Sequence, residues 1–186
     1  MVRTAPKPPC DNDVVICATS RTPLTKAKKG ALRDTAIETL LAHVIKDVCK
    51  KANCDLAKVD DIAVGNVLAP GAAATVARIA SFLAGFPHTT SVYSVNRFCS
   101  SGLQAVADIA NAIRSGQIDI GIGSGVESMS AYSFNDSVRA DLLAEEVFEH
   151  ETARNCLMGM GQTSDNVAKE FNVTREMQDE FAAKSQ

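Results

Sequence analysis

The stretch N-R-F-C-S-S-G-L-Q-A-V-A-D-I-A-N-A-I-R-S-G, residues 96–116, places a cysteine, Cys99, at the start of a predicted helix. Behind it, apolar residues recur at helical spacing and alanines occupy much of the remaining surface. A helix that is small and apolar on nearly all sides usually lies inside a protein. The pattern therefore predicts a helix over residues 99–114 that is packed between layers, with an apolar face made of Leu103, Val106, Ile109, Ala110 and Ile113.

The N-terminal end of such a helix is a favourable place for a nucleophilic thiol. Backbone N–H groups of the first turn have no partner within the helix and carry the positive end of its dipole, which favours a thiolate. The same groups can hold a developing oxyanion. Ser100, Ser101 and Gly102 are small enough to let a substrate carbonyl reach the sulfur of Cys99. Because many buried cysteines are inert, these residues alone leave both a catalytic and a structural interpretation of Cys99 open.

Predicted strands and helices alternate along the first two thirds of the chain. Apolar runs rich in β-branched residues, bounded by turn signals, predict four strands. They lie at residues 14–18, 61–68 and 91–95 and within 117–125. Alternation at these lengths favours an α/β fold with a mainly parallel sheet.

Two further helices separate these strands. Thr35 and Glu38 have the spacing of a capping box, and an amphipathic pattern follows them. A second helix is predicted over residues 72–84, where Gly85 and then Pro87 provide a stop signal.

The pattern changes after Gly125. A short acidic helix is predicted over residues 141–151, another over 162–171, and a third begins at Thr174. The third remains polar and periodic to the last residue without a cap, so we expect the chain to be a fragment. Residues 1–12 are expected to form a flexible tail.

Composition excludes several classes of protein. The chain has 186 residues and a formal net charge of -3, which gives no reason to expect nucleic-acid binding. No apolar run has the length of a membrane span, and the first ten residues lack the apolar core of a secretory signal. The six cysteines form no C-x-x-C pair, so we expect free thiols in a reducing compartment and no metal site.

Two other candidate motifs carry little weight. G-I-G-S-G, residues 121–125, lacks the G-x-G-x-x-G spacing and the following helix of a dinucleotide-binding loop. Glu127 has no second carboxylate placed with it in the sequence, so we do not expect it to be a catalytic acid.

V-N-R-F-C-S-S-G-L-Q-A-V-A, residues 95–107, closely resembles the nucleophile segment of the thiolases. Five other stretches resemble thiolase segments in the expected order: D-V-V-I, R-T-P, G-N-V-L, D-I-G-I-G-S-G-V-E-S-M-S and C-L-M-G-M-G-Q-T-S-D-N-V-A. The details are most similar to degradative 3-ketoacyl-CoA thiolases of the peroxisomal type. The resemblance implies a layered α/β fold with a buried central helix.

The resemblance also implies a reaction. Thiolases cleave a 3-ketoacyl-CoA with coenzyme A, giving acetyl-CoA and a shortened acyl-CoA through a cysteine acyl-enzyme. The nucleophile position matches Cys99, whose backbone N–H is expected to help form an oxyanion hole, and Met160 is expected near the substrate. No cofactor is expected beyond coenzyme A as a substrate. Phe98 departs from the family, which usually carries glutamine at this position.

By the same resemblance, residues 13–131 are the first α/β domain without its last strand, and residues 132–186 begin an inserted loop domain. The family's G-H-P, N-E-A and C-x-G motifs do not occur, so we expect the chain alone to be inactive. A homodimer is implied, with residues 91–95 near the two-fold axis. The expected compartment is the peroxisome, or the cytosol because no targeting signal is recognised. The alternatives are a biosynthetic thiolase, a decarboxylating condensing enzyme of the same broad fold, and a non-catalytic interaction fragment.

Overall fold

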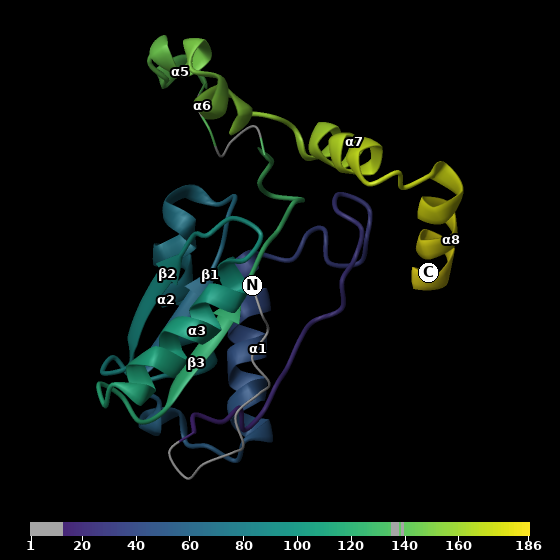
Figure 1. Cartoon of the computed structure of the whole chain (residues 1–186). Coiled ribbons are helices and arrows are strands. Elements are labelled where there is room, and N and C mark those ends of the chain that lie inside the picture. Colours follow the sequence, from purple (N-terminus) through teal and green to yellow (C-terminus); the bar gives the residue numbers. More distant parts are fainter. Residues whose placement is uncertain (1–12, 135–137, 139) are drawn as a thin grey trace. The chain divides into compact units, whose positions relative to one another are not determined.

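The computed structural model describes residues 13–134, 138 and 140–186. The described residues up to Val138 form one compact unit, and those after it form another. Figure 1 labels the helices and strands of both units.

The first unit is built on a three-stranded parallel sheet. The strands are β1 (Asp61–Gly65), β2 (Ser91–Val95) and β3 (Gly121–Gly125), in the order β2-β1-β3. Gly65, the last residue of β1, pairs with Val95 of β2 and with Gly125 of β3. The three strands therefore end at the same level, which brings the segments that follow them to one edge of the sheet.

Helices cover both faces of this sheet (Figure 1). α1 (Ile37–Lys51) and α2 (Ala74–Ala84) pack with Ile62 and Val64 of β1, because alternate strand residues point to opposite faces. α3 (Ser101–Arg114) packs on the other face, where Ala63 contacts Ala105 and Ile109. This arrangement is an α/β layered fold with parallel strands, as the sequence predicts.

α3 lies unusually close to the sheet. A Cβ added at Gly123 would lie 2.5 Å from Cα of Val106, and one added at Gly65 would lie 2.5 Å from the carbonyl carbon of Ser101. Both glycines are therefore required for the close approach of the helix to β1 and β3.

The predicted strand over residues 14–18 is wrong. Residues 13–26 have no regular secondary structure, and Val15 and Ile16 are 71% and 73% exposed. No named strand of the described chain pairs with this segment. Its β-branched residues favour an extended chain, but a strand is stable only with a hydrogen-bonded neighbour and a covered face.

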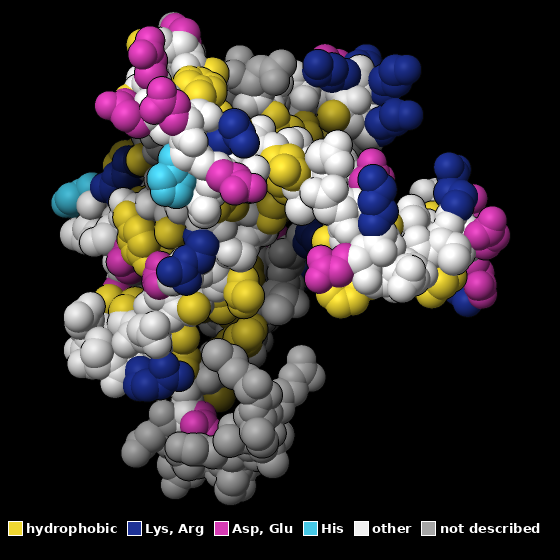
Figure 2. Space-filling model, turned by 45° about the horizontal axis from the view of Figure 1, so that its top comes forward, with side chains coloured by type: hydrophobic (Ala, Val, Ile, Leu, Met, Phe, Trp, Pro, Cys, Tyr) yellow, Lys and Arg dark blue, Asp and Glu magenta, His cyan; other side chains and the backbone are white. Residues whose placement is uncertain are grey.

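The prediction that α3 is buried on nearly all sides is also wrong for this chain. Its buried face consists of Ser101, Ala105 and Ile109, whereas Leu103 is 74% exposed and Val106 is 36% exposed. The sheet covers one side of the helix, and nothing in the described first unit covers the side that carries Leu103. Figure 2 shows hydrophobic side chains among the charged ones on one face of the molecule.

Several predicted boundaries shift. β1 ends at Gly65 rather than at residue 68, and α1 begins after Ala36 without a side-chain cap from Thr35. α2 begins at Ala74 rather than at residue 72, because Gly71, Ala72 and Ala73 have left-handed backbone angles. These three residues belong to the 3-10 turn Pro70–Ala73, which precedes α2. A further 3-10 turn, Leu56–Lys58, precedes β1.

The second unit consists of short helices. The predicted acidic helix is divided into the 3-10 turn Ala140–Leu142, α5 (Glu146–Glu149) and α6 (Glu151–Asn155). α7 (Met160–Glu170) and α8 (Arg175–Ser185) follow, and Thr174 caps α8 by accepting a hydrogen bond from the N–H of Met177. The assignment of this region to an inserted loop domain stays a prediction.

Candidate active site at the carboxyl ends of the strands

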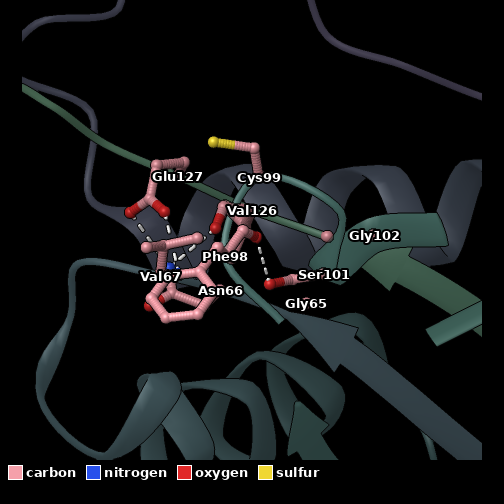
Figure 3. A pocket seen from close by; sticks show the side chains of 10 residues that line it. Gly65, Asn66, Val67, Phe98, Cys99, Ser101, Gly102, Val126 and Glu127 are labelled. Atoms are coloured by element: carbon pink, nitrogen blue, oxygen red, sulfur yellow. Dashed lines mark hydrogen bonds between the residues drawn. The ribbon is translucent and has the colours of Figure 1, made fainter. Parts of the chain in front are cut away.

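A pocket of about 280 Å³ opens where the three strands end. It is lined by residues 65–67 at the end of β1, by residues 98 and 99 before α3 and 101 and 102 in its first turn, and by residues 125–127 at the end of β3 (Figure 3). Ligands of open α/β sheets usually bind outside the carboxyl ends of the strands. The pocket therefore lies where the fold most readily forms a binding site.

Cys99 is exposed in the turn that joins β2 to α3. The helix starts at Ser101, with Ser100 as its N-cap, so Cys99 precedes the helix instead of being its first residue as predicted. Cys99 nevertheless lines the pocket, and it directly precedes the N-cap of α3 (Figure 3). The structure thus gives a reagent or substrate access to this thiol, while the role of its backbone N–H in an oxyanion hole stays a prediction.

Ser101 fixes the shape of this turn. Its side chain is buried, accepts a hydrogen bond from the N–H of Arg97 at 2.9 Å, and donates one to the carbonyl of Phe98 at 2.6 Å. The backbone N–H groups of Ser100 and Ser101 donate to the carbonyls of Arg97 and Phe98. The residues on both sides of Cys99 are therefore held by hydrogen bonds to the start of α3.

Phe98 has a left-handed backbone, with φ of 49°. This conformation is strained for a bulky residue, and such strain is often retained at functional sites. Its side chain is 78% exposed and lines the pocket beside Cys99. Phe98 thus presents an aromatic ring at the pocket, next to Cys99 in the chain.

Asn66 and Glu127, to which the sequence pattern assigned no role, line the pocket, and Asn96 bonds to the lining residue Val67. Asn66 is 1% exposed, and Glu127 accepts hydrogen bonds from Asn66 and from the backbone at Val67 and Leu68 (Figure 3). Asn96 donates to the carbonyl of Val67. Each of these residues closely follows a strand in the sequence. That position could have identified them, because polar residues that follow parallel strands meet at one edge of the sheet.

The other described cysteines have different environments. Cys17 and Cys156 are exposed, whereas Cys49 is buried in the core between α1 and α2. Burial, together with the nearby Cys54, raises the pKa of Cys49 to about 11. Cys10 lies outside the described residues.

The remaining candidate, Met160, is the first residue of α7 and is 62% exposed. It belongs to the second unit, so its expected place near the substrate stays a prediction. Histidine is absent from the described residues that line the pocket.

Within the described part of the chain, no three His, Cys, Asp or Glu residues gather as a metal site would require. The same residues include no helix long and apolar enough to cross a membrane.

Comparison with known proteins identifies the family. Residues 14–186 match the N-terminal domain of thiolases. The chain belongs to the thiolase family. This thiolase chain is 50% identical over 175 residues to 3-ketoacyl-CoA thiolase 1, peroxisomal, of Arabidopsis thaliana, covering 94% of the chain and 39% of that relative.

Solved structures agree with this thiolase assignment. The dimeric peroxisomal thiolase of Saccharomyces cerevisiae superposes with a TM-score of 0.84 and 42% identity, over 94% of this chain and 45% of that one. A second structure of peroxisomal 3-ketoacyl-CoA thiolase from S. cerevisiae, described as five layers built from two core domains of identical topology, gives a TM-score of 0.76 and 38% identity, over 100% of this chain and 48% of that one. The thiolase chain thus spans less than half the length of these three relatives.

Proposed function

We propose that this chain carries the nucleophile of a 3-ketoacyl-CoA thiolase and that Cys99 becomes acylated during thiolytic cleavage. The observation that carries the proposal is the exposed thiol of Cys99 at the pocket beside the first turn of α3. Relatives named peroxisomal 3-ketoacyl-CoA thiolases support the choice of substrate class.

The proposed reaction has two halves. The thiolate of Cys99 attacks the keto carbon, and the bond between that carbon and the neighbouring CH₂ breaks, leaving the acyl group as a thioester on the sulfur. The departing acetyl-CoA carbanion takes up a proton. The thiol of a second coenzyme A then attacks the thioester, releasing the shortened acyl-CoA and restoring Cys99.

The chain supplies part of this chemistry. The open pocket admits the keto carbon to Cys99, and we expect N–H groups at the N-terminal turn of α3 to hold the negative charge that develops on the substrate oxygen. The family's general base and proton donor lie in motifs that this sequence does not contain. Because general acid–base help is typically worth about 10²–10⁴-fold in rate, we expect the chain by itself to display the nucleophile without sustained turnover.

Dimerisation and compartment belong to the same proposal. A homodimer is supported by the dimeric yeast thiolase, and a peroxisomal location by the names of the relatives. β2 is an edge strand of the described sheet, so residues 91–95 have an unpaired edge that suits a contact between two copies.

Alkylation with iodoacetamide tests the acyl-transfer proposal. Cys17 and Cys156 are exposed thiols in the same chain and serve as internal references. We expect Cys99 to react fastest near neutral pH, and we expect acetyl-CoA to protect Cys99 but neither reference. Mass spectrometry of the digested chain measures each site. Equal rates at the three thiols without protection would contradict a live nucleophile.

A non-catalytic interaction module is the second candidate. The exposed Leu103 and Val106 on α3 favour it, since an uncovered apolar helix face suits a protein contact. The alkylation experiment separates the two candidates, because a passive module gives no preference for Cys99 and no protection by acetyl-CoA.

A further inference from the structure

The segment after β1 is fixed by Asn66. The Asn66 side chain is 1% exposed. Its amide nitrogen donates to the carbonyl of Val126 at 2.7 Å, and its amide oxygen accepts from the N–H of Ala69 at 3.0 Å. Its backbone N–H donates to the carbonyl of Val95. Asn66 thus connects the ends of all three strands, and its buried polar atoms are satisfied there.

Glu127 holds the same segment from the end of β3. One carboxylate oxygen accepts from the amide nitrogen of Asn66 at 3.2 Å. The other accepts from the N–H of Val67 at 2.9 Å and of Leu68 at 3.4 Å. Hydrogen bonds to an ionised carboxylate are stronger than neutral ones. The Glu127 side chain therefore anchors residues 66–68 although it is itself exposed.

Val67 transmits this anchoring to the turn that contains Cys99. Its N–H donates to Glu127, and its carbonyl accepts from the side-chain amide of Asn96 at 3.2 Å. The amide oxygen of Asn96 in turn accepts from the N–H of Phe98 at 3.0 Å. A continuous series of hydrogen bonds thus runs from Glu127 through Val67 and Asn96 to the residue before Cys99.

We propose that Glu127 is a positioning residue for Cys99, acting through Val67 and Asn96 to hold the strained Phe98–Cys99 turn against the start of α3. The proposal rests on the nucleophilic role of Cys99 proposed above. Phe98 needs such support because its left-handed backbone persists only where the surroundings determine it.

The charge of Glu127 provides a way to test positioning against simple electrostatics. Glu127 lines the same pocket as Cys99, and like charges repel one another, so a role through charge alone is the alternative to positioning. If charge alone mattered, removing it would make Cys99 react faster. Positioning predicts the opposite result, because a loosened turn no longer holds Cys99 at the pocket.

The test compares alkylation rates of Cys99 and Cys17 by iodoacetamide within each variant of the chain. For Glu127→Ala we expect the Cys99-to-Cys17 rate ratio to fall about tenfold, and the acetyl-CoA concentration that half-protects Cys99 to rise several-fold, since small misplacements of a reacting group have large rate effects. For Glu127→Gln we expect a smaller fall in the rate ratio, because the amide oxygen of the glutamine still accepts a hydrogen bond from the N–H of Val67. Glu145→Ala, which removes an exposed glutamate side chain of the second unit, should leave the ratio unchanged.

Asn96→Ala interrupts the same series of hydrogen bonds at a different residue, because it removes the bonds to Val67 and Phe98. We expect Asn96→Ala to lower the Cys99-to-Cys17 rate ratio as Glu127→Ala does. Combining the two substitutions should lower the ratio no further than either one alone, because the effects of residues in one network are not additive. Far-UV circular dichroism checks that each variant is folded. Should Glu127→Ala fail to fold, Glu127→Gln and Asn96→Ala decide the result.

Three outcomes overturn this proposal. The first is an unchanged or faster alkylation of Cys99 in Glu127→Ala, while in the wild-type chain Cys99 reacts selectively and is protected by acetyl-CoA. The second is an equal change at Cys17, which indicates general loosening of the fold. The third is a double variant whose effects simply multiply. A wild-type chain without selectivity at Cys99 instead overturns the acyl-transfer function itself.

Discussion

At the scale of single residues, Phe98 combines a bulky side chain with a backbone that favours glycine. Replacing it with glycine removes the strain of the left-handed conformation. We expect Phe98→Gly to raise the free energy of unfolding by about 1 kcal/mol, because such strain costs about 1–3 kcal/mol and part of the gain is offset by glycine's greater freedom in the unfolded chain.

Phe98→Ala is the matched control for this prediction. It removes the same ring, which is 78% exposed and contributes little burial, but keeps the Cβ that causes the strain. Urea unfolding of the three chains gives the comparison. A gain of equal size in Phe98→Ala would show that the ring, and not the backbone, is the source of the effect.

Cys49 allows a second prediction for a single residue. Burial raises its pKa to about 11, so at pH 8 the group is almost entirely in the unreactive thiol form. We expect iodoacetamide at pH 8 to modify Cys17 while Cys49 stays unmodified in the folded chain, and to modify both in urea. Modification of Cys49 at the rate of Cys17 in the folded chain would contradict the buried position of Cys49 between α1 and α2.

At the scale of elements, the contact between α3 and β3 depends on the absence of a side chain at Gly123. An added methyl would lie 2.5 Å from Cα of Val106, so the helix must move. We expect Gly123→Ala to lower the free energy of unfolding by about 1–3 kcal/mol through overpacking.

Gly102→Ala adds the same methyl to α3 where no atom lies within 4 Å of the added Cβ. We expect it to be neutral or slightly stabilising, because alanine favours a helix more than glycine does. Thermal unfolding measures both variants. If the two substitutions shift the midpoint equally, close packing at Gly123 does not hold α3 on the sheet.

The amino-terminal end of β1 gives a prediction that depends on pH. The N–H groups of Ile120 and Asp119 donate to Asp60 and lower the pKa of its carboxyl group. A lowered folded-state pKa means that Asp60 stabilises the fold above the unfolded value near 4 and that this contribution is lost as the pH falls through the folded value. We expect Asp60→Asn to lower the free energy of unfolding at pH 7, and the difference from wild type to shrink at pH 3.

The neighbouring Asp61 should behave in the opposite way. Burial is the main cause that raises the pKa of Asp61, so its ionised form destabilises the fold at neutral pH. Asp61→Asn should therefore raise the free energy of unfolding at pH 7 and have little effect at pH 3. Urea unfolding at the two pH values measures both variants, and a loss of stability at pH 7 in Asp61→Asn would contradict the assigned cause.

At the scale of the whole molecule, β2 is one of the two edge strands of the described sheet, and we expect its outer edge to form the proposed contact between copies. A lysine on an edge strand discourages pairing with another chain. We expect Tyr93→Lys to reduce the dimer fraction measured by analytical ultracentrifugation, whereas Val167→Lys, at an exposed position of α7, should leave it unchanged. An unchanged dimer fraction in Tyr93→Lys would exclude this edge as the contact.

Much of the fold was predictable because it is encoded locally. Turn signals and alternation gave the bounds of β2, and helical periodicity gave α1, the start of α8 and most of α3. The strand at residues 14–18 could not be judged in this way, because pairing depends on a neighbour that local sequence does not reveal. The start of α3 differed by two residues because Ser101 bonds back to Arg97 and Phe98 and tightens the turn.

The sequence by itself determined the family, the parallel α/β architecture and the presence of Cys99 at a strand-to-helix connection, since motifs and periodicity lie in contiguous residues. Only the tertiary structure decided the surroundings of that cysteine. Glu127 bonds to the backbone of Val67, which is 60 positions away in the chain, because the register of the parallel strands ends all three at one level. Such contacts depend on strand order and register, and no local pattern in the chain specifies them.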